Sequence, residues 1–173
     1  MKRVFDLILA ASLFLLLLIP LLLATILVIT TSKGSALYYS DRIGKNNSIF
    51  KMPKFRSMLT GTPAVATHLL DNPGAYLSPI GGFLRSTSLD ELPQLFSVLK
   101  GDMSFVGPRP ALFNQSDLIA LRAEKGVDKL LPGITGWAQV NGRDDLSIPD
   151  KVALDAEYLN RQSFWFDMKI LWM

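Results

Sequence analysis

The side chains best suited to chemistry are two adjacent carboxylates, Asp90 and Glu91. Pro93 follows them, and because proline lacks an N–H it is tolerated only in the first turn of a helix, which places a helix start near Asp90. Free N–H groups at a helix N-terminus favour negative charge. The pair therefore suits an ionised nucleophile beside a metal and a phosphate. The structural alternative is a helix cap, since Asp is a common N-cap and Ser88 to Glu91 matches a capping box.

Basic side chains that could hold phosphate stand near this pair and further along the chain. Arg85 lies just upstream, and Arg109 stands between two prolines that restrict the backbone and so aim its side chain. The planar fork of arginine suits phosphate. Lys54 and Arg56 alternate on a predicted strand, so both should point to one face about 7 Å apart. Either a diphosphate between them or a solvated strand face would accommodate the two cations.

A third motif is the glycine-rich stretch at residues 132–143. Glycines allow a ligand to approach the backbone closely. Gln139 and Asn141 could hydrogen-bond the edge of a base, Trp137 could stack on it, and Arg143 could meet a phosphate. The alternative is a turn that packs on the core.

The composition narrows the choice of metal and partner. The chain has no cysteine and one histidine, His68, which excludes thiolate sites, multi-histidine centres and Cys/His catalysis. A metal must therefore sit on oxygen ligands such as Asp90 and Glu91, which favours Mg²⁺ or Mn²⁺. The net charge of +3 suits an anionic membrane surface or substrate better than a nucleic-acid groove, so no nucleic-acid partner is expected.

Residues 7–29 form an almost unbroken apolar run with Pro20 in its middle. The run is too long for the apolar part of a signal peptide and has the length of a transmembrane helix. Proline should bend or break a helix, and basic residues flank both ends of the run, where the positive-inside rule places the cytoplasm. We therefore expect a helix that breaks at Pro20 and returns to the same membrane face. A straight span is the alternative.

The remaining pattern predicts short elements. Residues 36–40 and 49–58 should form a β-hairpin around the turn at residues 44–47, and residues 60–75 a loop. Helices are expected at residues 89–100, 112–125 and 150–162. Residues 164–172 are rich in aromatics, which suits either an interfacial membrane helix or a core helix. The predicted class is α+β: a re-entrant, proline-broken membrane helix (1–32) and a small, mostly helical globular domain (33–173) with a short hairpin and interfacial amphipathic helices.

In these residues the chain resembles the small monotopic phosphoglycosyl transferases, also called bacterial sugar transferases. The resemblance spans nearly the whole chain. It rests on the order and spacing of Lys2-Arg3-Val4-Phe5-Asp6, Pro20, Lys54-Phe55-Arg56-Ser57-Met58, Ser88-Leu89-Asp90-Glu91-Leu92-Pro93-Gln94-Leu95, Lys100-Gly101-Asp102-Met103-Ser104, Val106-Gly107-Pro108-Arg109-Pro110 and Pro132-Gly133-Ile134-Thr135-Gly136. The family often marks its helix break with Ser-Pro, whereas Ile19 precedes Pro20 here.

The resemblance implies a reaction and a location. A sugar 1-phosphate would pass from a UDP-sugar to a polyprenol phosphate such as undecaprenyl phosphate, with release of UMP, Mg²⁺ as cofactor and a covalent aspartyl-phosphosugar intermediate. Asp90 would be the nucleophile, and Glu91 would bind the metal or accept a proton. Lys54, Arg56, Arg85 and Arg109 would hold phosphates. The enzyme would sit in lipid at the cytoplasmic face of a bacterial inner membrane and supply downstream glycosyltransferases.

Two other functions are compatible with the same residues. One is a single-span membrane protein whose cytoplasmic domain binds a nucleotide-sugar without turning it over. The other is a membrane-anchored scaffold for glycan-assembly enzymes. Neither needs a nucleophile, so a covalent phosphosugar on the protein would separate the enzyme from both.

Overall fold

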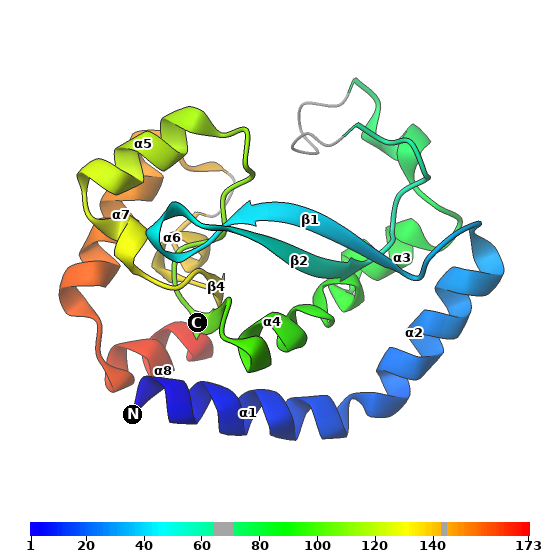
Figure 1. The fold of residues 1–173 in the computed structure, drawn as a ribbon, viewed down its shortest axis with the longest axis horizontal. Helices are drawn as coiled ribbons and strands as arrows, with labels where there is room; N and C mark the ends of the chain where they lie inside the picture. Colours follow the sequence, from blue (N-terminus) through cyan, green and yellow to red (C-terminus); the bar gives the residue numbers. More distant parts are fainter. Residues whose placement is uncertain (64–70, 143–144) are drawn as a thin grey trace.

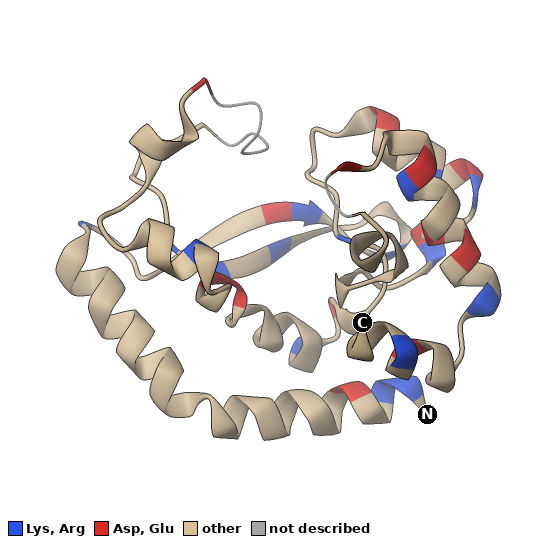
Figure 2. Cartoon of the chain, turned by 180° about the vertical axis from the view of Figure 1, so that it is seen from behind, with Lys and Arg blue, Asp and Glu red and all other residues tan. Residues whose placement is uncertain are grey.

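The computed structural model describes residues 1–63, 71–142 and 145–173 of the chain. Two N-terminal helices, α1 (Lys2–Leu16) and α2 (Leu18–Thr31), form a long angled arm, and the rest of the chain sits inside the angle (Figure 1). We call residues 2–31 the apolar arm. Charged residues occur only at the N-terminal end of α1 and are absent from α2 (Figure 2). The described part is α+β, as the sequence predicts.

The predicted hairpin is present and crosses the centre of the molecule (Figure 1). Strands β1 (Leu37–Ile43) and β2 (Ile49–Phe55) pair antiparallel, with Tyr38 opposite Lys54 and Arg42 opposite Phe50. The turn contains a short 3₁₀ helix, η1 (Lys45–Asn47), in which Asn46 adopts a φ of 54°. Asparagine tolerates this left-handed conformation better than most residues, which explains the turn.

Most of the remaining elements are short, and they lie on both sides of the hairpin (Figure 1). Helices and 3₁₀ turns follow in the order η3 (Pro73–Tyr76), α3 (Gly81–Ser86), η4 (Leu89–Glu91), α4 (Gln94–Lys100), α5 (Ser116–Glu124), η5 (Val127–Lys129), α6 (Trp137–Val140), α7 (Ile148–Arg161) and α8 (Phe164–Trp172). Strands β3 (Ser104–Val106) and β4 (Gly133–Thr135) form a parallel pair that the sequence did not indicate.

Three helix predictions can be compared with these bounds. The helix expected at residues 150–162 is confirmed as α7. The one expected at residues 112–125 is confirmed only from Ser116 onward, as α5. The one expected at residues 89–100 is confirmed only from Gln94 to Lys100, as α4 ending at Gly101, because residues 89–91 form the separate 3₁₀ turn η4 before Pro93.

The apolar arm bends at Leu17 and not at Pro20. α1 ends at Leu16 and α2 begins at Leu18, with an angle of 62° between them. The proline ring clashes with the carbonyl four residues earlier, which belongs to Leu16, and is tolerated in a first helical turn. Pro20 is the third residue of α2, so the break falls one turn before the proline, and the prediction of a break at Pro20 itself is wrong in position.

Both ends of the apolar arm are fastened to the globular part. At its start, Lys2 donates to Asp167 Oδ2 (2.5 Å) and to the carbonyl of Val106 (3.0 Å). Arg3 donates to the carbonyls of Val98 and Leu99 at the end of α4.

The second fastening lies at the end of α2. There Arg56 donates to the carbonyl and hydroxyl oxygens of Ser32. Lys2 and Arg3, expected as membrane-flanking charges, are thus engaged within the protein.

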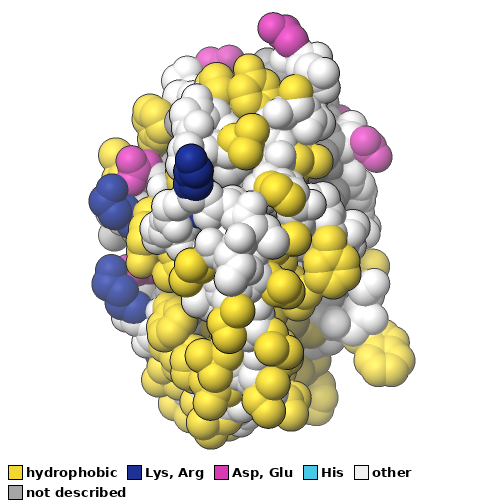
Figure 3. Space-filling model, turned by 90° about the vertical axis from the view of Figure 1, so that its right-hand side faces the viewer, with side chains coloured by type: hydrophobic (Ala, Val, Ile, Leu, Met, Phe, Trp, Pro, Cys, Tyr) yellow, Lys and Arg dark blue, Asp and Glu magenta, His cyan; other side chains and the backbone are white. Residues whose placement is uncertain are grey.

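The inner side of the apolar arm packs into the core, and its outer side is exposed. Ala10 joins the main core cluster with the hairpin, α4, β3, α7 and α8, while Leu21, Ala24 and Val28 pack with Phe55 and Leu84. Large apolar side chains such as Leu15, Ile19, Leu22 and Ile26 remain exposed. On the α2 side of the molecule the surface nearest the bend is hydrophobic (Figure 3).

The length and apolar composition of the helices indicate which of them could lie in a membrane. Within the described ranges, no single helix is long and apolar enough to cross a bilayer, whereas α1 and α2 together pass that test as a bent pair. One side of helix α8 packs in the core, as one of the two expectations for it stated, and its other side is exposed. Phe166 and Ile170 are buried in the core, while the side chains of Trp165 (79% exposed) and Trp172 (92% exposed) face outward.

Asp6 offers a direct test of how the apolar arm is held. Its buried carboxylate accepts hydrogen bonds from the Ser104 hydroxyl and the Phe105 N–H. Asp6→Ala leaves both donors unpaired, so the free energy of unfolding should fall by about 2–6 kcal/mol, at about 1–3 kcal/mol per buried unpaired group. Denaturant titration measures this loss.

The control variant is Asp41→Ala, which removes an exposed ion pair with Lys51. It should change the free energy of unfolding by less than about 1 kcal/mol. Equal effects of the two substitutions would show that Asp6 does not hold the arm.

Candidate active site

A cleft with a volume of about 700 Å³ opens beside the hairpin. Six basic and three acidic side chains line it, drawn from β1, β2, α3, η4, α5, α7 and the loops between them. Its lining is Arg42, Lys54, Pro73, Arg85, Ser88, Asp90, Glu91, Arg109, Pro110, Ala111, Leu112, Gln115, Leu118, Arg122, Asp145 and Lys151. The excess of cations makes the cleft suitable for a polyanionic ligand.

Asp90 lies in η4, at the edge of the cleft, and only 8% of its surface is exposed. Ser88, two residues before Asp90, has a left-handed φ of 55°. This conformation turns the chain from α3 into η4. Ser88 makes no side-chain cap, and Asp90 lies within the turn and not at its N-cap. The capping-box interpretation of this segment is therefore wrong, and capping does not account for the carboxylate.

Burial and neighbouring charges act in opposite directions on Asp90. Burial is the larger effect and holds the pKa of Asp90 above its usual value, and the nearby Glu91 raises it further. Lys54 and Arg85 lower the same pKa. Because a buried carboxylate is stabilised by cations close to it, these two basic residues favour the ionised form.

Glu91 is bound to the hairpin. Its Oε1 accepts a hydrogen bond from Lys54 Nζ at 2.7 Å and lies 3.9 Å from Arg109 Nη2. Burial lowers the pKa of Lys54, and Glu91 acts against that shift. The ion pair joins β2 to η4 and so fixes the position of the two carboxylates relative to the cations.

Arg109 reaches the cleft from residues 107–110, which we call the Arg109 segment. This segment leaves β3 and passes close to β4, where the Gly133 N–H donates to the carbonyl of Pro108 at 2.9 Å. A Cβ on Gly133 would come within 2.2 Å of the Gly107 nitrogen, so only glycine fits there. The close approach of the two backbones explains part of the glycine-rich stretch without a ligand.

Arg42 is a further basic residue of the cleft, and its spacing in the sequence gives no sign of this role. It lies on the same face of the hairpin as Lys54, since both belong to the alternating set that includes Tyr38. Burial lowers the pKa of Arg42 to about 10, and the charge of Arg109 contributes. Arg42 and Arg109 line the same cleft, and the positive charge that they add suits an anionic ligand.

Comparison with known proteins agrees with this chemistry. The sequence profile described as bacterial sugar transferase matches residues 1–173. The chain belongs to the bacterial sugar transferase family. It is 41% identical to a sugar transferase of Bacillus subtilis, EpsL, over 99% of this chain and 83% of that protein.

Two further relatives carry names that state an activity. An undecaprenyl-phosphate glucose phosphotransferase of Komagataeibacter xylinus is 42% identical over 99% of this chain and 34% of its own length. An undecaprenyl-phosphate galactose phosphotransferase of Salmonella typhimurium is 36% identical over 99% of this chain and 39% of its own length. The chain thus spans well under half the length of several relatives that it matches.

The structure brings five of the predicted site residues of this sugar transferase to one cleft. They are Lys54, Arg85, Asp90, Glu91 and Arg109. Arg56 is not among the lining residues, because it points to the end of α2, where it bonds Ser32. The expectation that Lys54 and Arg56 point to the same face and hold a diphosphate between them is therefore wrong.

The glycine-rich stretch also differs from its expected role. Gln139 donates to the carbonyl of Ile134, and Asn141 donates to the carbonyl of Trp137, so both side chains brace their own turn. The Trp137 indole donates to Glu157 and its ring packs near Phe166. None of the three lines the cleft, which favours the alternative that this stretch is a turn packed on the core. Arg143, the fourth residue predicted to contact the ligand, lies outside the described residues.

The carboxylates fit one kind of metal site. In the described ranges, no group of three or more acidic, histidine or cysteine side chains could hold an ion by itself. Asp90 and Glu91 offer two carboxylates at the edge of a cationic cleft. Mg²⁺ commonly binds through one or two carboxylates together with water and substrate phosphates. The pair therefore fits Mg²⁺ that binds with a phosphorylated substrate.

Proposed function

We propose that this sugar transferase moves a sugar 1-phosphate from a UDP-sugar to a polyprenol phosphate, such as undecaprenyl phosphate, and releases UMP. The observation that carries the proposal is Asp90, a nearly buried carboxylate among cations in a cleft beside an apolar arm. The names of the two phosphotransferase relatives support the lipid acceptor and the transferred group. The sugar itself differs between those relatives.

The reaction we propose has two displacements at one phosphorus. A carboxylate oxygen of Asp90 attacks the sugar-bearing phosphorus, and the bond from that phosphorus to the bridging oxygen breaks, so that UMP leaves. A phosphate oxygen of the polyprenol phosphate then attacks the same phosphorus and displaces the Asp90 carboxylate. The product is a polyprenyl diphosphate sugar, the substrate that downstream glycosyltransferases would extend.

The basic residues of the cleft supply most of what these steps require. A carboxylate can approach a negatively charged diphosphate only where cations neutralise it. Arg42, Lys54, Arg85 and Arg109 all line the cleft with Asp90. When bound, Mg²⁺ would add positive charge on the phosphate oxygens. Glu91 would hold the metal or take the proton from the incoming acceptor phosphate.

We propose further that the apolar arm enters and leaves one leaflet of a bacterial inner membrane, with residues 33–173 on the cytoplasmic face. Both ends of the arm bind the same globular part, through Lys2 and Asp167 at one end and Ser32 and Arg56 at the other. A straight span would place those two ends on opposite faces. The exposed apolar residues around the bend and the outward Trp165 and Trp172 suit contact with lipid.

The nucleophile is tested by Asp90→Asn. The substitution keeps the size of the side chain but removes its charge and nucleophilicity, so transfer should fall by at least about 1,000-fold. Formation of UMP before acceptor is added should also be lost. Asp117→Asn, the same change at an exposed position on α5 outside the cleft lining, should leave both unchanged. Near wild-type transfer by folded Asp90→Asn would reject the covalent mechanism and favour a protein that only binds.

The charge balance at Asp90 predicts a pH effect. Lys54 lowers the pKa of Asp90, so Lys54→Met should raise it. Because the ionised carboxylate is the nucleophile, the rate falls as pH drops through this pKa, and the acid limb of the profile should move to higher pH. Lys51→Met removes an exposed lysine on the same strand and should leave the limb in place. If the acid limb of Lys54→Met stayed at its wild-type position, Lys54 would not be lowering the pKa of Asp90.

The metal requirement is tested with a chelator. EDTA should abolish transfer, and excess Mg²⁺ should restore it, because the proposed ligands, Asp90 and Glu91, are carboxylates, which suit Mg²⁺. The melting temperature should change little on chelation, since the site fits an ion that arrives with substrate. Full activity in EDTA would rule out a divalent cation.

Topology can be measured by cysteine labelling, since the chain has no cysteine of its own. A cysteine inserted after Met1 and, separately, Ser35→Cys mark the two ends of the apolar arm. Both should react with a membrane-impermeant maleimide only in inverted vesicles, which expose the cytoplasmic face. Reaction of either one in intact spheroplasts would show that the arm crosses the membrane.

A further inference from the structure

The backbone of the Arg109 segment is held by donors from three other elements. Its two prolines have no N–H, so the carbonyls carry most of its backbone hydrogen bonding. The carbonyl of Pro108 accepts from the Gly133 N–H (2.9 Å), that of Arg109 from Arg122 Nη1 (2.8 Å), and that of Pro110 from Arg42 Nη1 (3.1 Å). Arg122 alone of these donors binds the residue whose side chain we assign to phosphate.

Arg122 is fixed from the opposite side by a buried carboxylate. Its Nε and Nη2 donate to Asp155 Oδ2 of α7 at 2.9 and 2.7 Å. The two side chains are 9% and 2% exposed, so water screens the pair little. Burial raises the pKa of Asp155, and Arg122 opposes that shift. The ion pair thus ties α5 to α7 and leaves Nη1 directed at the Arg109 carbonyl.

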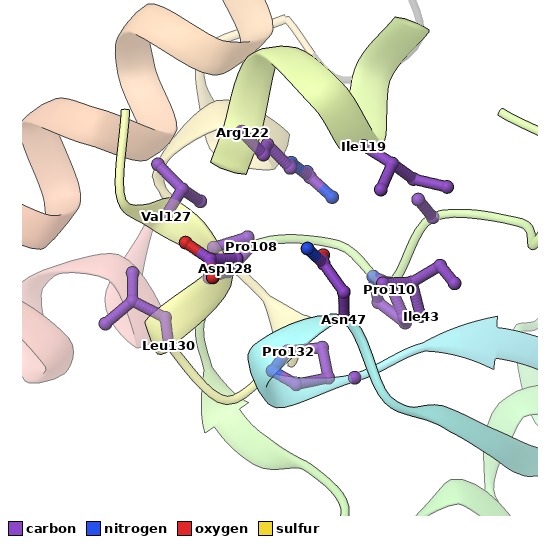
Figure 4. Close-up of a pocket in the computed structure, with 12 residues that line it drawn as sticks. Ile43, Asn47, Pro108, Pro110, Ile119, Arg122, Val127, Asp128, Leu130 and Pro132 are labelled. Carbon is purple, nitrogen blue, oxygen red and sulfur yellow. The ribbon is translucent and has the colours of Figure 1, made fainter. Parts of the chain in front are cut away.

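The space around this contact is loosely filled. Figure 4 shows Arg122 extending from α5 over the stretch between Pro108 and Pro110. A cavity of about 30 Å³ lies against these residues, lined also by Asn47, Val127 and Leu130. Because this volume is larger than about 10–15 Å³, the room one water needs, side-chain packing does not by itself fix the segment there.

We propose that Arg122, oriented by Asp155, is a positioning residue that fixes the backbone of Arg109 and so aims the Arg109 guanidinium at the substrate phosphate. This inference rests on the proposed function of the cleft. Arg122 also lines that cleft, but it donates twice to Asp155 and once to the Arg109 carbonyl. The Asp155 carboxylate neutralises its charge. Arg122 therefore acts on substrate through Arg109 and not by direct contact.

A double-mutant cycle separates this role from a merely structural one. Removing Arg122 alone would bury an unpaired Asp155, so we use Arg122→Met with Asp155→Leu, which replaces the pair by apolar side chains of similar size. This paired replacement should weaken UDP binding by about 10-fold in the wild-type background. In an Arg109→Met background it should weaken binding by less than about 2-fold, because the residue it acts through is gone. Calorimetry with UDP gives all four constants.

The matched control is Arg3→Met, which also removes a guanidinium that holds two carbonyls, those of Val98 and Leu99. Its effect should be the same in both Arg109 backgrounds. Equal losses from the paired replacement in both backgrounds would overturn the proposal, since Arg122 would then act by general stabilisation or by direct contact. If the paired replacement does not fold, Arg122→Lys is carried through the same cycle with the same criteria.

Hydrogen–deuterium exchange separates failure of this inference from failure of the proposed function. The paired replacement should speed exchange in a peptide covering residues 105–112 and leave one covering residues 94–100 unchanged. If wild-type protein did not bind UDP, the proposed donor would be wrong, yet this exchange difference would still support positioning. Unchanged exchange at residues 105–112 would overturn the positioning role whatever the ligand.

Discussion

The site depends on one carboxylate, Asp90, which is nearly buried in the wall of the cleft. Such a group is stable as an anion only when cations lie close by. Lys54 and Arg85 supply that charge, and Lys54 also binds Glu91. The site therefore requires the hairpin, α3 and η4 to keep their positions relative to one another. Arg42 and Arg109 also line the cleft and add to its excess of positive charge, which a substrate diphosphate would neutralise.

The apolar arm and the cleft are parts of one framework. Lys2, at the start of the arm, and the Tyr158 hydroxyl both donate to the carbonyl of Val106, the last residue of β3. The Arg109 segment begins at the next residue. The start of the apolar arm and the start of the Arg109 segment thus meet at the end of one strand. This arrangement suits an enzyme whose donor is soluble and whose acceptor stays in the membrane.

Much of the local structure could be predicted from the sequence. The alternation in the two strands and the turn at Gly44 predicted the hairpin, and the Asp-Glu pair with its basic neighbours indicated residues that the fold brings to one cleft. What could not be predicted depends on contacts distant in sequence. The β3–β4 pair has only three residues a strand, and Arg42 becomes a cleft residue only through its packing against the Arg109 segment.

Two errors have the same origin. Arg56 alternates with Lys54 in the sequence, but it follows the last residue of β2 and turns to the end of α2. Gln139 and Asn141 have suitable groups for a base, but their own turn uses them. In both cases a backbone carbonyl took the donor that the sequence analysis assigned to a ligand. Sequence spacing locates a side chain on a face, and only the fold decides which acceptor it meets.

The central claim is that Asp90 becomes covalently bound to phosphosugar during turnover. The most direct measurement is mass spectrometry of protein incubated with UDP-sugar and Mg²⁺ without acceptor, then denatured and digested. The account predicts a mass increase equal to one sugar phosphate on the peptide that contains Asp90, lost when polyprenol phosphate is added before denaturation. Unmodified protein under conditions in which UMP is released, or an adduct on another residue, would contradict it.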